Sequence, residues 1–235
     1  MPKLILLRHG QSQWNLEDRF TGWVDVDLTP EGEAQAKKGG ELIAAEGLAI
    51  DRCFTSVLTR AIRTSWLALA AAKQTFVPET KDWRLNERHY GGLTGLNKTE
   101  TAARHGAEQV TIWRRSYDVP PPPLAAGGAY DFSSDRRYAG AVLPDTESLE
   151  TTLERVQPYW ESDIVPHLAA GETLLVAAHG NSLRAIVKLL FSLSAEEILH
   201  IEVPTGNPLL IDLDAALKPT AARYLDGARA QKLPI

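Results

Sequence analysis

Short apolar runs separated by helical patterns are the feature of this sequence that most restricts its fold. The runs at residues 4–7, 53–55 and 174–178 are too short for helices, and helical periodicity fills the segments between them. This alternation is typical of parallel strands joined by crossover helices. It predicts an α/β fold, a three-layer sandwich around a mostly parallel central sheet. Residues 207–214 are expected to form a last, antiparallel strand at an edge of that sheet.

Two of the intervening helices have clear sequence signals. The first is predicted to start with Thr29 as its N-cap and Pro30 at its first position, and to stop at Gly47. The second is predicted over about residues 58–73, where alanine and leucine supply helix propensity.

The second half of the chain is less regular. A long helix is predicted over about residues 146–168, with Pro158 and Pro166 as kinks or breaks. Residues 117–144 are rich in proline, glycine and serine, and their apolar residues show no periodicity that would indicate a helix or a strand. A loop of this length inside a compact domain is expected to be functional or mobile.

Composition restricts the class of protein. The chain has 235 residues, of which 44% are hydrophobic, enough for a sizeable core, and we expect one domain over residues 1–235 with a flexible tail at 218–235. A net charge of −5 argues against a broad nucleic-acid surface. The single cysteine, Cys53, cannot form an internal disulfide, and no apolar run is long enough for a membrane span. A cytoplasmic protein without nucleic-acid or membrane partners is expected.

Two of the predicted strands end in a histidine followed by a glycine. His9 and Gly10 follow the first run, and His179 and Gly180 follow the run that ends at residue 178. Ligands of open α/β sheets bind beyond the carboxyl ends of the strands, and glycine lets the backbone approach a ligand closely. One such histidine alone would be interpreted as an ordinary strand-end residue. The duplication instead predicts a shared pocket.

Several kinds of chemistry lack their sequence signals. The six histidines show no HExxH or similar metal-ligand spacing, and the basic residues expected near the pocket would repel cations, so no metal is expected. The chain has no GxxxxGK[ST] loop, no GxGxxG after a strand and no Gly-x-Ser-x-Gly elbow. What remains is a histidine nucleophile that attacks a phosphoryl group held by arginines.

Six sequence blocks resemble one protein family. The blocks LLRHGQSQWN, TSVLTRAIRT and AAHGNSLR are similar to the histidine phosphatase superfamily. Three others, RFTGWVDVDLTPEG, LNERHYGGLTGLNKTETA and WRRSYDVPPPPL, are similar to its cofactor-dependent phosphoglycerate mutase branch. The resemblance extends over residues 3–214. It implies interconversion of 3-phosphoglycerate and 2-phosphoglycerate through a phosphohistidine, primed by 2,3-bisphosphoglycerate without metal, in glycolysis and gluconeogenesis.

The same resemblance implies a role for individual residues. His9 would take the phosphoryl group, and Glu87 would act as general acid and base. Arg8, Arg60 and His179 would surround the transferring group and spread positive charge around it. The implied substrate-binding residues are Asn15, Thr21, Gly22, Tyr90, Lys98, Arg114, Arg115, Gly180 and Asn181. Four other arginines are left outside the site and interpreted as ion pairs or surface charge: Arg63, Arg84, Arg88 and Arg184.

Three alternatives are weighed against this hypothesis. A phosphatase of the same superfamily would pass the phosphoryl group from His9 to water, but it would not need the second anion site implied by Lys98 and the Arg114-Arg115 pair. A bisphosphoglycerate synthase is a closer rival, and Gly22 favours the mutase because the synthase branch tends to carry a bulkier residue there. A non-enzymatic phosphate-binding protein would be expected to lack His9 or Glu87. By family analogy, a homodimer is expected.

Overall fold

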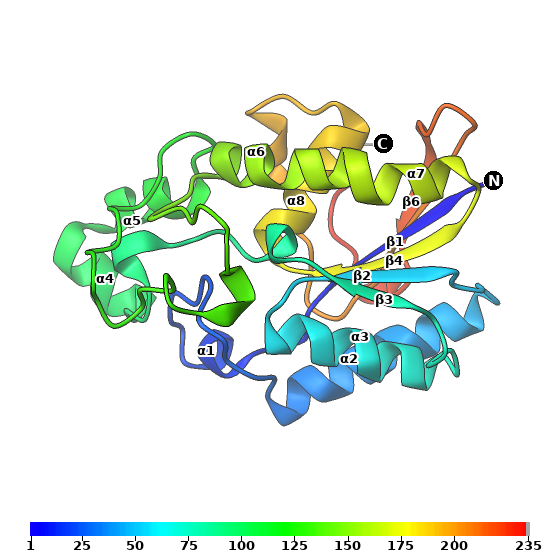
Figure 1. Cartoon of the computed structure of the whole chain (residues 1–235), viewed down its shortest axis with the longest axis horizontal. Helices are drawn as coiled ribbons and strands as arrows, with labels where there is room; N and C mark the ends of the chain where they lie inside the picture. The colour runs from blue at the N-terminus through cyan, green and yellow to red at the C-terminus, as the bar shows by residue number, and fades with distance from the viewer. Residues whose placement is uncertain (234–235) are drawn as a thin grey trace.

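A mixed β-sheet runs through the middle of the molecule (Figure 1). The computed structural model describes residues 1–233, which form six strands in the order β3-β2-β4-β1-β5-β6. Four strands run parallel: β1 (Lys3–Arg8), β2 (Arg52–Thr55), β3 (Glu79–Lys81) and β4 (Thr173–Ala178). Two further strands extend the sheet with antiparallel pairing: β5 (Leu209–Leu213) and β6 (Pro219–Tyr224).

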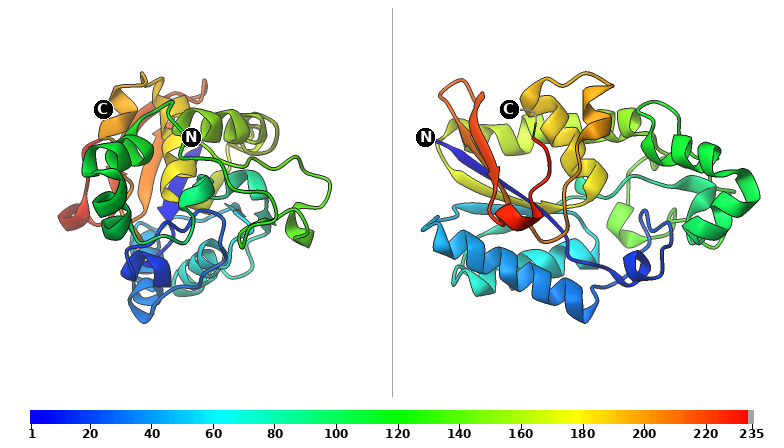
Figure 2. Two further views of the ribbon diagram at one scale, coloured as in Figure 1. Left: turned by 90° about the vertical axis from the view of Figure 1, so that its left-hand side faces the viewer. Right: turned by 180° about the vertical axis from the view of Figure 1, so that it is seen from behind.

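Helices cover both faces of the sheet, which confirms the predicted three-layer arrangement (Figures 1 and 2). One face carries α2 (Pro30–Ala45) and α3 (Thr59–Ala71). The other face carries α6 (Leu149–Tyr159), α7 (Val165–Ala169) and α8 (Gly180–Phe191). Three more helices gather at the end of the sheet where the parallel strands finish: α1 (Gln13–Leu16), α4 (Lys98–His105) and α5 (Ala107–Arg115).

The two faces of β1 pack into different hydrophobic clusters because successive side chains of a strand point to opposite sides. Leu4 and Leu6 belong to the cluster that contains residues of α6 and α8. Ile5 and Leu7 belong to the cluster that contains residues of α2 and α3. All four side chains are fully buried, so β1 is a central strand with a fixed register.

The starts of α2 and α3 are stabilised in different ways. The hydroxyl of Thr29 accepts a hydrogen bond from the backbone N–H of Gly32 at 3.1 Å, as the sequence predicts. The residue before α3, Leu58, provides no side-chain cap. The carboxylate of Asp25, from a distant loop, accepts the backbone N–H of Thr59 at 2.7 Å instead.

The long helix of the second half differs in part from its prediction. It begins at Leu149, where the Ser148 hydroxyl accepts the N–H of Thr151 at 3.2 Å, and not at residue 146. Pro158 lies inside its last turns, and the helix then widens into a π-helical stretch, Trp160–Ile164, before α7 begins. The interruption predicted near the prolines is therefore present.

The C-terminal segment requires a correction. Strand β5 is antiparallel as predicted, but the edge of the sheet is β6, formed by residues 219–224 of the expected flexible tail. Its last residue, Tyr224, is buried, and its hydroxyl donates to the carbonyl of Glu202 at 2.8 Å. The rest of β6 is mostly exposed, which hides the apolar alternation by which a strand is usually recognised.

The loop at residues 117–144 is irregular apart from a short 3₁₀ turn, Arg136–Tyr138. Part of it covers Trp23, since the ring of Tyr138 lies 5.0 Å from that indole, centroid to centroid. No helix within residues 1–233 is long and apolar enough to cross a membrane.

Candidate active site

The two histidines that follow the strands lie side by side. Strands β1 and β4 are parallel neighbours with Arg8 opposite Ala178, so the residues that come next emerge together. The backbone N–H of His9 donates to the carbonyl of Ala178 at 3.0 Å. The rings of His9 and His179 are 5.0 Å apart, centroid to centroid, with their planes at 62°.

The orientation of the His9 ring leaves one nitrogen free. Its Nδ1 lies 2.7 Å from the carbonyl oxygen of Gly10, which can only accept, so Nδ1 carries the proton. Nε2 therefore has an available lone pair, and His9 lines a pocket at the end of the sheet. Gly10 must be glycine, because a Cβ there would lie 2.1 Å from the carbonyl oxygen of Gly32.

His179 is oriented by a residue that the sequence did not identify. Its Nε2 lies 2.7 Å from the hydroxyl of Ser56, and that hydroxyl already accepts the N–H of Leu58 at 3.2 Å. This contact fixes the orientation of the imidazole ring. Within residues 1–233, the buried Nδ1 has no hydrogen-bond partner. The only sequence signal for Ser56 is its place directly after a predicted strand.

Both imidazoles are held neutral. Burial is the main cause that puts the pKa of His9 well below its ordinary value of 6.5, and the charges of Arg60 and Arg8 lower it further. Burial and the same two arginines, together with His9 itself, lower the pKa of His179. A neutral His9 with a free Nε2 is the form that can act as a nucleophile near pH 7.

This burial predicts that stability falls in mild acid. Below about pH 6.5 the unfolded histidines take up protons while the folded ones stay neutral, so the free energy of unfolding decreases by up to about 1.4 kcal/mol per pH unit for each. Urea unfolding at about pH 7.5 and pH 5.5 measures the loss, to which the buried His89 also contributes because its pKa is lowered by burial too. In His9→Asn the pH dependence should be shallower. An unchanged dependence in that variant would contradict the prediction.

The pocket beside His9 collects nearly all the predicted site residues. Its volume is about 150 Å³. The lining residues are Arg8, His9, Asn15, Arg19, Phe20, Thr21, Gly22, Arg60, Glu87, Tyr90, Lys98, Arg114, Arg115, Gly180, Asn181, Arg184 and Glu202. Among the residues proposed from the sequence, His179 alone does not line the cavity, although its ring is 5.0 Å from that of His9. Four lining residues are additional to the prediction: Arg19, Phe20, Arg184 and Glu202.

Arg60 is fixed by backbone carbonyls. It donates from its two terminal nitrogens to the carbonyls of Gly22 and Val24 at 2.7 and 2.8 Å. Gly22 has a φ of +51°, a conformation that favours glycine, so the turn that receives Arg60 depends on it. Burial lowers the pKa of Arg60 to about 10, which still leaves the guanidinium charged at neutral pH.

The arginines left outside the predicted site divide into two kinds. Arg63 and Arg84 form ion pairs with acidic residues outside the pocket, as interpreted. Arg184 and Arg88 do not, and for them the interpretation is wrong. Arg184 lines the pocket, donates to Asn181 Oδ1 at 3.1 Å, and has its pKa lowered to about 10, mainly by burial. Arg88 is buried and donates to the backbone carbonyl of Arg114 at 3.0 Å.

Glu87 presents one carboxylate oxygen to the pocket. Its Oε1 accepts the backbone N–H of Arg88 at 2.7 Å and both the backbone and side-chain N–H groups of Asn181 at 3.2 and 2.8 Å. Oε2 has no hydrogen-bond partner within residues 1–233. One oxygen therefore anchors the carboxylate at the N-terminus of α8, and the other is available for proton transfer.

The charge of the pocket fits a polyanion. In the part of the chain that the structure describes, seven lining side chains are basic and two are acidic, and one acid, Glu202, pairs with Arg115. Three arginines in or beside the cavity have buried donors without a partner among residues 1–233: Arg8 Nε, Arg88 Nε and Nη1, and Arg184 Nε. Buried donors without partners are costly unless a ligand accepts from them. The same residues contain no group of three His, Cys, Asp or Glu side chains placed to hold a metal ion.

The fold and the paired histidines define the class of protein. A model of the histidine phosphatase superfamily (branch 1) matches residues 4–216, and the chain belongs to this superfamily. A relative from Caulobacter vibrioides (strain NA1000 / CB15N) is 78% identical over 234 residues, 100% of this chain and 99% of its own. It is named 2,3-bisphosphoglycerate-dependent phosphoglycerate mutase. A relative from Hyphomonas neptunium with the same name is 61% identical over the same shares. The resemblance drawn from the sequence blocks is thereby confirmed.

The fold recurs in proteins of much lower similarity. The alpha-ribazole phosphatase from Shigella flexneri superposes with a TM-score of 0.70 at 21% identity, covering 99% of this chain and 98% of its own. At this identity the likeness shows the fold alone.

Proposed function

We propose that this chain interconverts 3-phosphoglycerate and 2-phosphoglycerate through a phosphohistidine on His9, primed by 2,3-bisphosphoglycerate. The observation that carries the proposal is the position of the His9 ring, whose free Nε2 lines a pocket with seven basic residues and the carboxylate of Glu87. The names of the relatives at 78% and 61% identity support the same reaction. It is a step of glycolysis and gluconeogenesis.

Each residue at the active site has its own role in the transfer of the phosphoryl group. His9 Nε2 attacks phosphorus, an N–P bond forms, and the P–O bond to the leaving oxygen breaks. Glu87 Oε2 gives its proton to that oxygen, and in the reverse direction it takes the proton of the attacking hydroxyl. Arg8 and Arg60 line the pocket and stabilise the charge on the oxygens of the transferring group, and His179 supports His9 from 5.0 Å away, centroid to centroid.

The second half of the pocket holds the part of the substrate that does not react. Lys98, Arg114 and Arg115 supply positive charge for a carboxylate and a second phosphate, and Tyr90 and Arg184 line the same pocket. The same set would hold 2,3-bisphosphoglycerate, which supplies the phosphoryl group of His9 when it is bound. A general phosphatase has no need of this second anion site, which favours the mutase.

A coupled assay tests the proposal. Purified protein with 3-phosphoglycerate should form 2-phosphoglycerate, and the rate should rise after addition of 2,3-bisphosphoglycerate. EDTA should leave the rate unchanged, because arginine side chains and not a metal ion neutralise the charge of the phosphate. Release of inorganic phosphate without 2-phosphoglycerate would favour the phosphatase. Net accumulation of bisphosphoglycerate would favour the synthase, and loss of activity in EDTA with recovery on added manganese would point to a metal.

Two further features stay predictions. The homodimer rests on family analogy, and light scattering of the purified protein measures it. The cytoplasmic location rests on the glycolytic role and on the single buried cysteine, Cys53.

A further inference from the structure

The segment that carries Glu87 has no regular structure of its own. Residues 86–90 lie between two 3₁₀ turns, Trp83–Leu85 and Gly91–Leu93, and belong to no helix or strand. Residues 86–89 are nevertheless buried, and buried N–H and C=O groups need partners. Side chains from elsewhere must therefore hold this segment in place.

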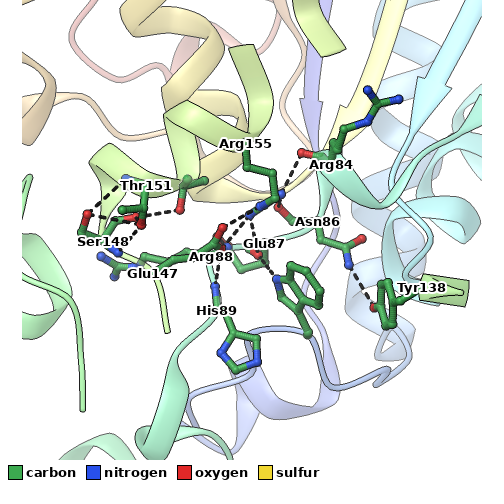
Figure 3. Close-up of polar contacts among 12 residues, drawn as sticks. Arg84, Asn86, Glu87, Arg88, His89, Tyr138, Glu147, Ser148, Thr151 and Arg155 are labelled. Atoms are coloured by element: carbon green, nitrogen blue, oxygen red, sulfur yellow. Dashed lines mark hydrogen bonds and ion pairs between the residues drawn. The ribbon is translucent and has the colours of Figure 1, made fainter. Parts of the chain in front are cut away.

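Several of those partners come from one buried ion pair (Figure 3), and the indole of Trp23 donates to the carbonyl of Glu87 at 2.6 Å. Arg155 in α6 contacts both carboxylate oxygens of Glu147, from Nε at 2.6 Å and from Nη2 at 2.8 Å. The side chains are only 7% and 2% exposed. A bidentate arginine–carboxylate pair of this kind has a fixed geometry, unlike an exposed pair on flexible side chains.

Both members of the pair bind the backbone around Glu87. Arg155 donates from Nη1 to the carbonyls of Arg84 and Asn86 at 2.7 and 3.2 Å, and from Nη2 to the carbonyl of Glu87 at 3.2 Å. Glu147 accepts the N–H of His89 at 2.8 Å through its side chain and donates its own N–H to the His89 carbonyl at 2.9 Å. The segment is thus held on both sides of Glu87.

The fixed backbone determines where the carboxylate lies. A glutamate side chain has three rotatable bonds, and Oε1 of Glu87 is restrained only by Arg88 N–H and by Asn181. A shift of the backbone would carry Oε2 away from the leaving oxygen, and a misplacement of about 1 Å can cost about 10²-fold in rate. Neither Glu147 nor Arg155 lines the pocket beside His9.

We propose that the buried Glu147–Arg155 pair is the positioning element that holds Glu87 for proton transfer. The inference rests on the role proposed for Glu87. It assigns a function to two residues that lie outside the pocket, and it predicts that their loss impairs the proton-transfer step more than substrate binding or the attack by His9.

Two substrates with different leaving groups distinguish a defect in proton transfer from a defect in the attack by His9. Phosphoglycerate leaves as an alkoxide unless it is protonated, whereas p-nitrophenolate is stable as an anion and needs no proton. With p-nitrophenyl phosphate, the burst of p-nitrophenolate reports attack by His9 alone, since the P–O bond breaks as the N–P bond forms. Arg155→Met should lower kcat for 3-phosphoglycerate by about 10²-fold, with KM and the burst rate within about threefold of wild type.

Companion variants make the test independent of stability. Arg155→Lys keeps a charge but cannot reproduce the planar fork, and Glu147→Gln keeps an acceptor for His89 N–H but leaves Arg155 without its charge partner. Both should show the same selective loss, to a smaller extent. Leu168→Ala, in the fully buried core of α7, is the matched control, because it should lower Tm while leaving the ratio of the two activities unchanged.

The outcomes distinguish this inference from the proposed function. If Glu87→Gln loses kcat while the folded Arg155→Lys and Glu147→Gln variants keep it, the positioning role is wrong and that of Glu87 stands. Equal losses with both substrates, or the same selective loss in Leu168→Ala, would also overturn the positioning role. If Glu87→Gln itself keeps wild-type kcat, the role proposed for Glu87 is wrong, and this inference is wrong with it.

Discussion

Replacing His9 with alanine should abolish the covalent phosphoenzyme and lower mutase activity by at least about 10⁴-fold, because His9 is the one histidine among residues 1–233 that lines the pocket. We do not expect His179 to replace it, since His179 does not line the pocket and its Nε2 lies 2.7 Å from the hydroxyl of Ser56. Incubation with 2,3-bisphosphoglycerate labelled in the phosphoryl group should give an acid-labile, base-stable adduct in the wild type and none in the variant.

The matched control is His105→Ala, a histidine on the exposed side of α4. It should label at the wild-type level, which shows that the assay reports one residue and not histidine content. Labelling of His9→Ala at the wild-type level would exclude His9 as the nucleophile, and peptide mapping of the adduct would then locate the group that replaces it.

Glu87→Gln should have the second largest effect, a fall in kcat of roughly 10²- to 10⁴-fold with little change in KM. The amide can keep the hydrogen bonds that Oε1 accepts from Arg88 and Asn181, so the fold and the pocket should persist. What it loses is the ability to give or take a proton at the position of Oε2. Steady-state kinetics with 3-phosphoglycerate measure the loss, and thermal unfolding checks the fold.

Glu202→Gln is the matched control, because Glu202 is the other carboxylate of the pocket and pairs with Arg115. Its loss should alter KM, through the substrate-binding side of the pocket, more than kcat. If both variants lower kcat alike, the effect comes from the charge of the pocket, and Glu87 is not the specific proton donor. An unchanged kcat in Glu87→Gln would remove it from the mechanism.

Much of the site followed from local sequence patterns. The apolar runs before His9 and His179 predict two strands, and parallel pairing brings their carboxyl ends to one edge of the sheet. Thr29 and Pro30 mark the start of α2 for a similarly local reason, since an N-cap acts within one turn of its helix. The sequence blocks that resemble the histidine phosphatase superfamily identified further pocket residues, which hydrophobic periodicity alone does not indicate.

Only the tertiary structure decided which side chains meet across large distances in the chain. Ser56 is 123 residues from His179, and Arg155 is 68 residues from the carbonyl of Glu87 that it binds. Strand β6 exists because β5 offers it an edge, although its own exposed residues carry little strand signal. Charge in the sequence also does not tell a buried arginine such as Arg184 from one on the surface, because burial is decided by the elements that pack around it. Local structure depends on neighbours within a turn or a strand, whereas these contacts depend on how whole elements are placed.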